Sequence, residues 1–267
     1  MADIATLVAA AGYLITVLLI YLYISRGKSS RKLAAGFGAV WAAALFFHAI
    51  ALGQSLLSPV GLDLSFHNAI SLVVWLVSLL LFITSMRCPM EILGIPTLGI
   101  GAVLIVAGIF HPDLKAQIVQ GDPGLEWHVL GSLLAFALFT LAAVQAIVLA
   151  YQDHRLHNHQ LKGWVSYLPS LQFMESFLFQ LIGVGFALLT LSLISGWLFV
   201  DDIFAQRLAH KTLLSIFAWI IFGTLLLGRA FAGWRGRTAV RLTLVGFSLL
   251  TLAYFGSKMV LEIILAR

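Results

Sequence analysis

The chain has 267 residues, of which 61% are hydrophobic and only 10% are charged, and its formal net charge is +5. Soluble domains carry about 25% charged residues, so this composition excludes an ordinary globular domain. Continuous apolar runs of about 20 residues indicate helices that span a bilayer, and they favour helices over a closed barrel. The single cysteine, Cys88, excludes an internal disulfide and a CxxC redox pair.

Eight apolar runs follow one another along the chain. We predict membrane-spanning helices over residues 4–24, 33–57, 68–86, 92–110, 127–151, 174–200, 212–231 and 239–265. The second run begins with Gly36 and Gly38, which favour close helix packing. Because no linker separates domains, the sequence predicts an all-α integral membrane protein that forms a single bundle over residues 1–267.

Basic residues are concentrated in alternate connecting segments, at 25–32, 87–91, 152–172 and 229–241. These four segments hold eleven lysines and arginines, whereas the other connecting segments hold three. The positive-inside rule therefore places the basic segments in the cytoplasm and both termini in the periplasm. This placement accounts for the net positive charge, and we expect no nucleic acid among the partners.

Motifs in the chain resemble those of a known membrane family. WHVL (127–130) opens the fifth run, and GFALLTLSLISGWLF (185–199) precedes a run that contains Trp219. GWRGR (233–237) and LTLAYFGSK (250–258) follow. Together they resemble the cytochrome c assembly (CcsA/ResC) family over nearly the whole chain, most closely its HemX/YpjD-type branch. The resemblance implies haem handling, since members that carry haem to apocytochrome c ligate its iron with external histidines that flank a tryptophan-rich segment.

The family's functional residues match this chain unevenly. His128 matches the first flanking histidine. The family's Trp-Asp-Pro-Lys-Glu type sequence is absent, and His210 stands where its proline would be. No histidine follows the YFG motif, where the second flanking histidine is found. These departures favour an accessory role over a full haem synthetase.

The predicted cofactor is haem b, bound at the periplasmic face. His128 begins the fifth run and His210 precedes the seventh, so both lie at the external membrane boundary. Imidazole is a common axial ligand of haem iron. Arg207 and Lys211 are the cations of the segment between the sixth and seventh runs, and they could pair with haem carboxylates. The alternative is that both histidines are ordinary interfacial residues.

Three further residues are candidates for cofactor contact. Trp127 and Trp197 could flank a porphyrin, although tryptophans are common in the interfacial belt of membrane proteins. His48 lies inside the second run. Ionisable groups within a membrane are costly and often functional. His48 is therefore either a further ligand-site residue or a neutral imidazole that hydrogen-bonds to another helix.

The sequence thus predicts a multi-pass protein of the bacterial inner membrane, with lipid, haem and possible cytochrome c assembly or other membrane proteins as partners. The phosphate-loop and HExxH motifs are absent, and we see no nucleophile arrangement, so we do not expect an enzyme. Two alternatives stay open. One is a non-haem membrane scaffold or regulatory interaction protein that kept the fold and lost the ligand site. The other is a small-molecule transporter, which the polar groups inside the runs would serve.

Overall fold

Eight long apolar helices dominate the computed structural model. It describes residues 2–28, 30–58, 61–110, 118–119, 123–158, 164–199 and 206–256. Within these ranges, eight helices are long and apolar enough to cross a membrane. This confirms the predicted helix number and the all-α membrane class, whereas the single bundle and the periplasmic termini stay predictions.

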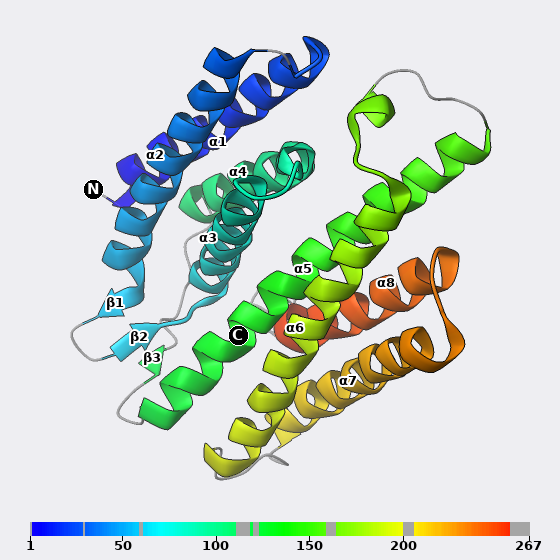
Figure 1. The fold of residues 1–267 in the computed structure, drawn as a ribbon. Helices are drawn as coiled ribbons and strands as arrows, with labels where there is room; N and C mark the ends of the chain where they lie inside the picture. The colour runs from blue at the N-terminus through cyan, green and yellow to red at the C-terminus, as the bar shows by residue number, and fades with distance from the viewer. Residues whose placement is uncertain are drawn as a thin grey trace. The chain divides into compact units, whose positions relative to one another are not determined.

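The helices follow the predicted order (Figure 1). They are α1 (Ala2–Ser25), α2 (Arg31–Leu56), α3 (Phe66–Ser85), α4 (Gly94–Phe110), α5 (Pro123–His157), α6 (Leu171–Phe199), α7 (Gln206–Ala232) and α8 (Arg237–Thr251). Short 3₁₀ turns, η1 (Glu91–Leu93) and η2 (Trp164–Tyr167), precede α4 and α6, and the π-helical η3 (Leu252–Gly256) continues α8.

The chain divides into two compact units. The N-terminal unit contains Met1–Gly121 and Tyr151–Leu171, and the C-terminal unit contains Asp122–Ala150 and Gln172–Arg267. The long helix α5 therefore contributes its first part to the C-terminal unit and its last turns to the N-terminal unit.

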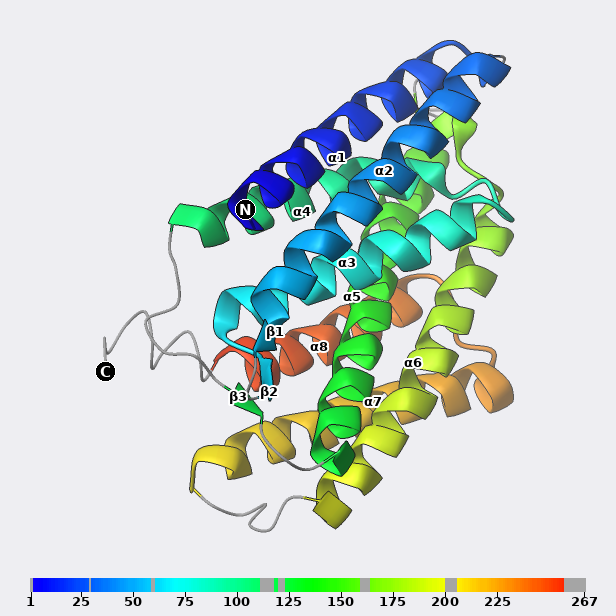
Figure 2. The same cartoon turned by 90° about the vertical axis from the view of Figure 1, so that its left-hand side faces the viewer.

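In the N-terminal unit, α1 packs along both α2 and α4, and α3 packs against α2 and α4 (Figures 1 and 2). The helices α1 and α2 approach closely at Gly12, where a Cβ atom would lie only 2.8 Å from Cβ of Ala44. By contrast, a Cβ at Gly36 or Gly38 would meet no described atom within 4 Å. The close approach predicted for Gly36 and Gly38 thus occurs at a different glycine.

A small antiparallel sheet lies within the N-terminal unit, where the sequence predicted a helix that ended at Leu57 and connecting segments. Its strands are β1 (Leu57–Ser58), β2 (Gly61–Asp63) and β3 (Ile118–Val119), in the order β1-β2-β3. Leu62 is paired with Leu57 on one side and with Val119 on the other. This pairing joins two connecting segments that are far apart in the sequence and satisfies backbone polar groups outside the helices.

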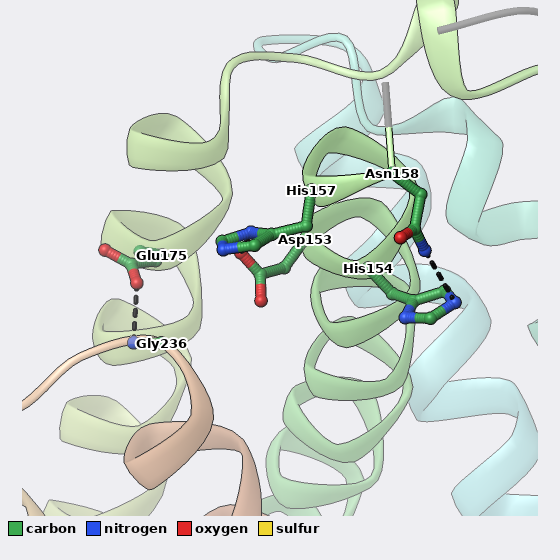
Figure 3. Close-up of polar contacts among 6 residues, drawn as sticks. All are labelled: Asp153, His154, His157, Asn158, Glu175 and Gly236. Carbon is green, nitrogen blue, oxygen red and sulfur yellow. Dashed lines mark hydrogen bonds and ion pairs between the residues drawn. The ribbon is translucent and has the colours of Figure 1, made fainter. Parts of the chain in front are cut away.

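The helix α5 extends well beyond the apolar run that predicted it. Helix α5 continues past residue 151 to His157, so the start of the predicted polar segment is helical. Basic side chains near a helix C-terminus interact favourably with its dipole. Pairs four residues apart also line this turn: His157 Nδ1 lies 3.8 Å from Asp153 Oδ1, and Asn158 Nδ2 lies 3.2 Å from His154 Nε2 (Figure 3).

An aromatic pair forms the centre of the C-terminal unit. The rings of Phe139 on α5 and Phe222 on α7 stack with centroids 4.0 Å apart. A Cβ atom at Gly185 on α6 would lie 3.1 Å from Phe139, and one at Gly246 on α8 would lie 2.8 Å from Phe222. Two glycines therefore let four helices close around the buried rings. This core fixes α5 against α6, where the candidate site lies.

Candidate functional site

His128 lies near the start of α5, and its half-buried imidazole contacts α6. Its Nδ1 atom is 2.9 Å from Oγ of Ser195. The two residues are far apart in the sequence, and they meet because α5 and α6 run antiparallel around the Phe139–Phe222 core.

The hydrogen bonds of Ser195 and Ser192 orient the imidazole of His128. The Ser195 hydroxyl donates to the backbone carbonyl of Ser192 at 3.1 Å. A serine hydroxyl has a single hydrogen, so with this bond formed Oγ can accept a hydrogen bond from Nδ1–H of His128. In that tautomer the neutral imidazole has its lone pair on Nε2. The imidazole also hydrogen-bonds to the backbone of Ser192.

Gly196 fixes the position of the same imidazole. A Cβ atom on Gly196 would lie 3.0 Å from Cε1 of His128 and 3.6 Å from each ring nitrogen. The ring thus rests against the backbone of α6 at a point where any side chain would displace it. Two consecutive residues of α6 orient His128, one by a hydrogen bond and the other by the absence of a side chain.

The two candidate tryptophans lie beside these contacts in the sequence but on the surface. Trp127 precedes His128 and is 75% exposed, and Trp197 follows Gly196 and is 77% exposed. Both belong to the end of the C-terminal unit where α5 begins and α6 ends. Such exposure is typical of interfacial tryptophans, and it leaves both indoles accessible to a ligand. Their contact with a porphyrin stays a prediction.

The remaining candidates at this end lie on α7. Helix α7 begins at Gln206, so Arg207, His210 and Lys211 are in its first turns and not in a connecting loop, which corrects the predicted start at residue 212. Lys211 is half-buried. The side chains of Arg207 and His210 lie outside what the structure describes, so the pairing of His128 with His210 stays a prediction.

His48 lies in the other unit, in the middle of α2, and it is fully buried. Its Nδ1 is 2.9 Å from the hydroxyl of Tyr13 on α1, and its Nε2 is 2.9 Å from Oγ of Ser71 on α3. Both ring nitrogens are therefore engaged. This geometry fits the alternative of an imidazole that hydrogen-bonds between helices, and it leaves no nitrogen for a ligand.

The sequence analysis did not identify Ser192, Ser195 and Gly196 as site residues. All three lie in the stretch that carried the family resemblance, but a serine and a glycine in an apolar helix are usually packing residues. The signal that would have found them is their helical spacing: Ser195 and Gly196 follow Ser192 by three and four residues, so the three share one face of a helix.

Comparison with known proteins shows the family of the chain. The model of the family described as "Cytochrome C assembly protein" matches residues 37–265. The chain belongs to this family. Because the described residues also include eight helices long and apolar enough to cross a membrane, it is a multi-pass membrane protein, and the predicted family and inner-membrane localisation are confirmed.

The related proteins are membrane and cytochrome c biogenesis proteins. The inner membrane protein YpjD of Escherichia coli (strain K12) is 33% identical over 223 residues, which cover 83% of this chain and 84% of YpjD. An uncharacterized 28.8 kDa protein of Azospirillum brasilense is 31% identical over 246 residues, 86% of this chain and 90% of that protein. The cytochrome c biogenesis protein CcsA of Mesostigma viride is 26% identical over 139 residues, covering 48% of this chain and 46% of CcsA. No solved structure matches the chain significantly.

Proposed function

We propose that this CcsA-like protein binds haem b at the periplasmic face, with His128 as an axial ligand, and that it holds or presents the cofactor as an accessory protein in cytochrome c assembly. The observation that carries the proposal is the hydrogen bond between Nδ1 of His128 and Oγ of Ser195, because the Nδ1–H tautomer has its lone pair on Nε2. A hydrogen bond to the opposite nitrogen is the usual device by which proteins orient a ligating imidazole.

The charges near this end of the C-terminal unit suit a dicarboxylate ligand. Arg207 and Lys211 are both in the first turns of α7, where the helix dipole also favours anions. They would pair with the haem propionates, and Trp127 and Trp197 would contact the porphyrin edge. When bound, haem supplies an iron centre that takes a histidine nitrogen as its axial ligand.

The role that we propose is binding and not catalysis. The ligand site that we propose consists of a histidine, two cations and two aromatic side chains. The absence of the family's tryptophan-rich motif supports an accessory role. The concentration of eleven basic residues in alternate segments supports periplasmic termini, and hence a periplasmic position for His128.

The test is the visible spectrum of the purified protein in mild detergent, oxidised and reduced, before and after addition of haem. His157 is the matched control because it is an exposed histidine at the other end of the same helix. We expect a Soret band that His128→Ala removes and His157→Ala preserves. A shifted band in His210→Ala would make His210 the second ligand.

Two results would contradict the proposal. If the wild-type protein gives no Soret band even with added haem, the non-haem scaffold becomes the better account. If His128→Ala binds haem with the wild-type spectrum, the ligand is another residue. A substrate flux that depends on His48 would instead support the transporter alternative.

A further inference from the structure

Helix α8 continues into an irregular turn. The π-helical η3 (Leu252–Gly256) has hydrogen bonds that span one residue more than those of an α-helix, and such turns are frequent at functional sites. It carries Tyr254 and Phe255, which belong to the LTLAYFGSK stretch of the sequence. The haem site proposed above uses neither residue.

The aromatic side chains of η3 pack onto α5. The centroid of the Tyr254 ring lies 5.2 Å from that of Phe136, and the centroid of the Phe255 ring lies 5.3 Å from it. Phe247, about two turns earlier on α8, also contacts Phe136, at 5.6 Å between centroids. Phe136 is only 5% exposed. Two consecutive side chains of η3 therefore meet the same buried ring, which fixes the π-helical turn against α5.

The hydroxyl of Tyr254 makes a second contact with α5. It hydrogen-bonds to the side chain of Ser132, which precedes Phe136 by about one helical turn and is nearer the start of the helix. The Ser132 hydroxyl donates to the backbone carbonyl of Val129 at 2.8 Å. A serine hydroxyl has a single hydrogen, so Oγ of Ser132 accepts and the phenol of Tyr254 donates.

Ser132 is the point at which α5 enters the core. Residues 124–131, which include His128, are half-buried or exposed. Ser132 is 5% exposed and is the first buried residue of α5 among those whose side chains the structure describes. Segments with few buried contacts open most easily. His128 precedes Ser132 by four residues, so the two share one face of the helix, and the Tyr254 contact lies one turn from the imidazole.

We propose that Tyr254 is a positioning residue of the His128 site. Its hydroxyl holds Ser132 and thereby keeps the first turns of α5 where His128 reaches Ser195 on α6. This inference rests on the haem site proposed above, and it adds the end of α8 to the elements that support the ligand. The imidazole is set directly by α6 and, through α5, by η3.

Tyr254→Phe tests the hydroxyl because this change keeps the ring that packs on Phe136. Ser132→Ala removes the same hydrogen bond from the other partner and serves as the test if Tyr254→Phe does not fold. Ser248→Ala is the matched control, since it removes from α8 an exposed hydroxyl that bonds within its own helix, to the carbonyl of Leu244 at 2.9 Å. The intact variants are purified in mild detergent, and thermal unfolding shows that they are folded.

The first measurement is a titration with haem, followed by the Soret band. The net contribution of one hydrogen bond corresponds to about twofold to tenfold in an equilibrium constant. Tyr254→Phe and Ser132→Ala should each weaken haem binding by about this factor. The double variant should lose no more than either single variant, because both changes remove one contact. Ser248→Ala should bind haem as the wild type does.

The second measurement needs no haem. Diethyl pyrocarbonate acylates the neutral imidazole of histidine, and mass spectrometry of the digested protein gives the rate at each histidine. We expect Tyr254→Phe to raise the rate at His128 by about twofold or more, since the first turns of α5 are less firmly held. The rate at the exposed His157, at the other end of α5, should stay the same. A general loss of stability would raise both rates.

The two measurements separate this inference from the proposed function. If the wild type binds no haem but Tyr254→Phe selectively raises the rate at His128, the haem function is wrong and the positioning role stands. If the wild type binds haem, and Tyr254→Phe matches it both in affinity and in the rate at His128, the positioning role is wrong. Equal effects of Ser248→Ala and Tyr254→Phe, or losses that multiply in the double variant, would also overturn it.

Discussion

Replacing Gly196 by alanine tests the orientation of His128 without removing it. The new Cβ would lie 3.0 Å from Cε1 of His128, whereas carbon atoms pack best at about 3.5–4.0 Å. The imidazole must therefore retreat by about 0.5–1 Å. The Nδ1–Ser195 distance of 2.9 Å then approaches the limit of hydrogen bonding. Such a bond contributes about 0.5–1.5 kcal/mol, and since 1.4 kcal/mol is tenfold in affinity, haem affinity should fall roughly twofold to twelvefold.

The control for this variant lies on the same helix. A Cβ at Gly183 would meet no described atom within 4 Å, so Gly183→Ala should leave haem binding unchanged. Affinity is measured by titrating haem into the purified protein and following the Soret band, with thermal unfolding to show that both variants are folded. The reasoning fails if Gly196→Ala binds haem as tightly as the wild type, or if Gly183→Ala weakens binding as much.

Other predictions concern stability. Tyr13→Phe removes the hydroxyl that contacts His48 and leaves a buried imidazole nitrogen without its partner, at a cost of about 1–3 kcal/mol. Thermal unfolding in detergent should show a lower midpoint for Tyr13→Phe but not for Tyr21→Phe, whose side chain is 60% exposed; equal midpoints would contradict the role of the buried contact. Gly246→Ala places a methyl group 2.8 Å from the Phe222 ring and should destabilise by about 1–3 kcal/mol through overpacking, while a midpoint equal to the wild type would show that the ring has room to move.

The family and the number of membrane-spanning helices were accessible from the sequence because they depend on local properties. A bilayer fixes the length of an apolar run that spans it, so eight helices could be placed before any contact was known. Their ends were less predictable. Helix α5 continues to His157 and α7 begins at Gln206, because backbone hydrogen bonding and the helix dipole continue where the apolar composition stops.

Close helix contacts depend on residues that no periodicity distinguishes. Gly36 and Gly38 satisfy the composition expected of a packed interface, yet the close approach is made by Gly12 against Ala44. In lipid, apolar side chains give little preference for one helix face over another, so packing is decided by the fit of particular side chains.

His128 illustrates what each level determined. The sequence alone placed it at a membrane boundary and, through the family resemblance, among candidate haem ligands. Only the tertiary structure brought Ser195 and Gly196 against its ring. For His48 the tertiary structure argued against a ligand role. Its position within a membrane helix suggested function, but both of its ring nitrogens hydrogen-bond to neighbouring helices. The reason is physical: the apolar runs are set by local composition, whereas the hydrogen bonds of an imidazole depend on partners that distant segments supply.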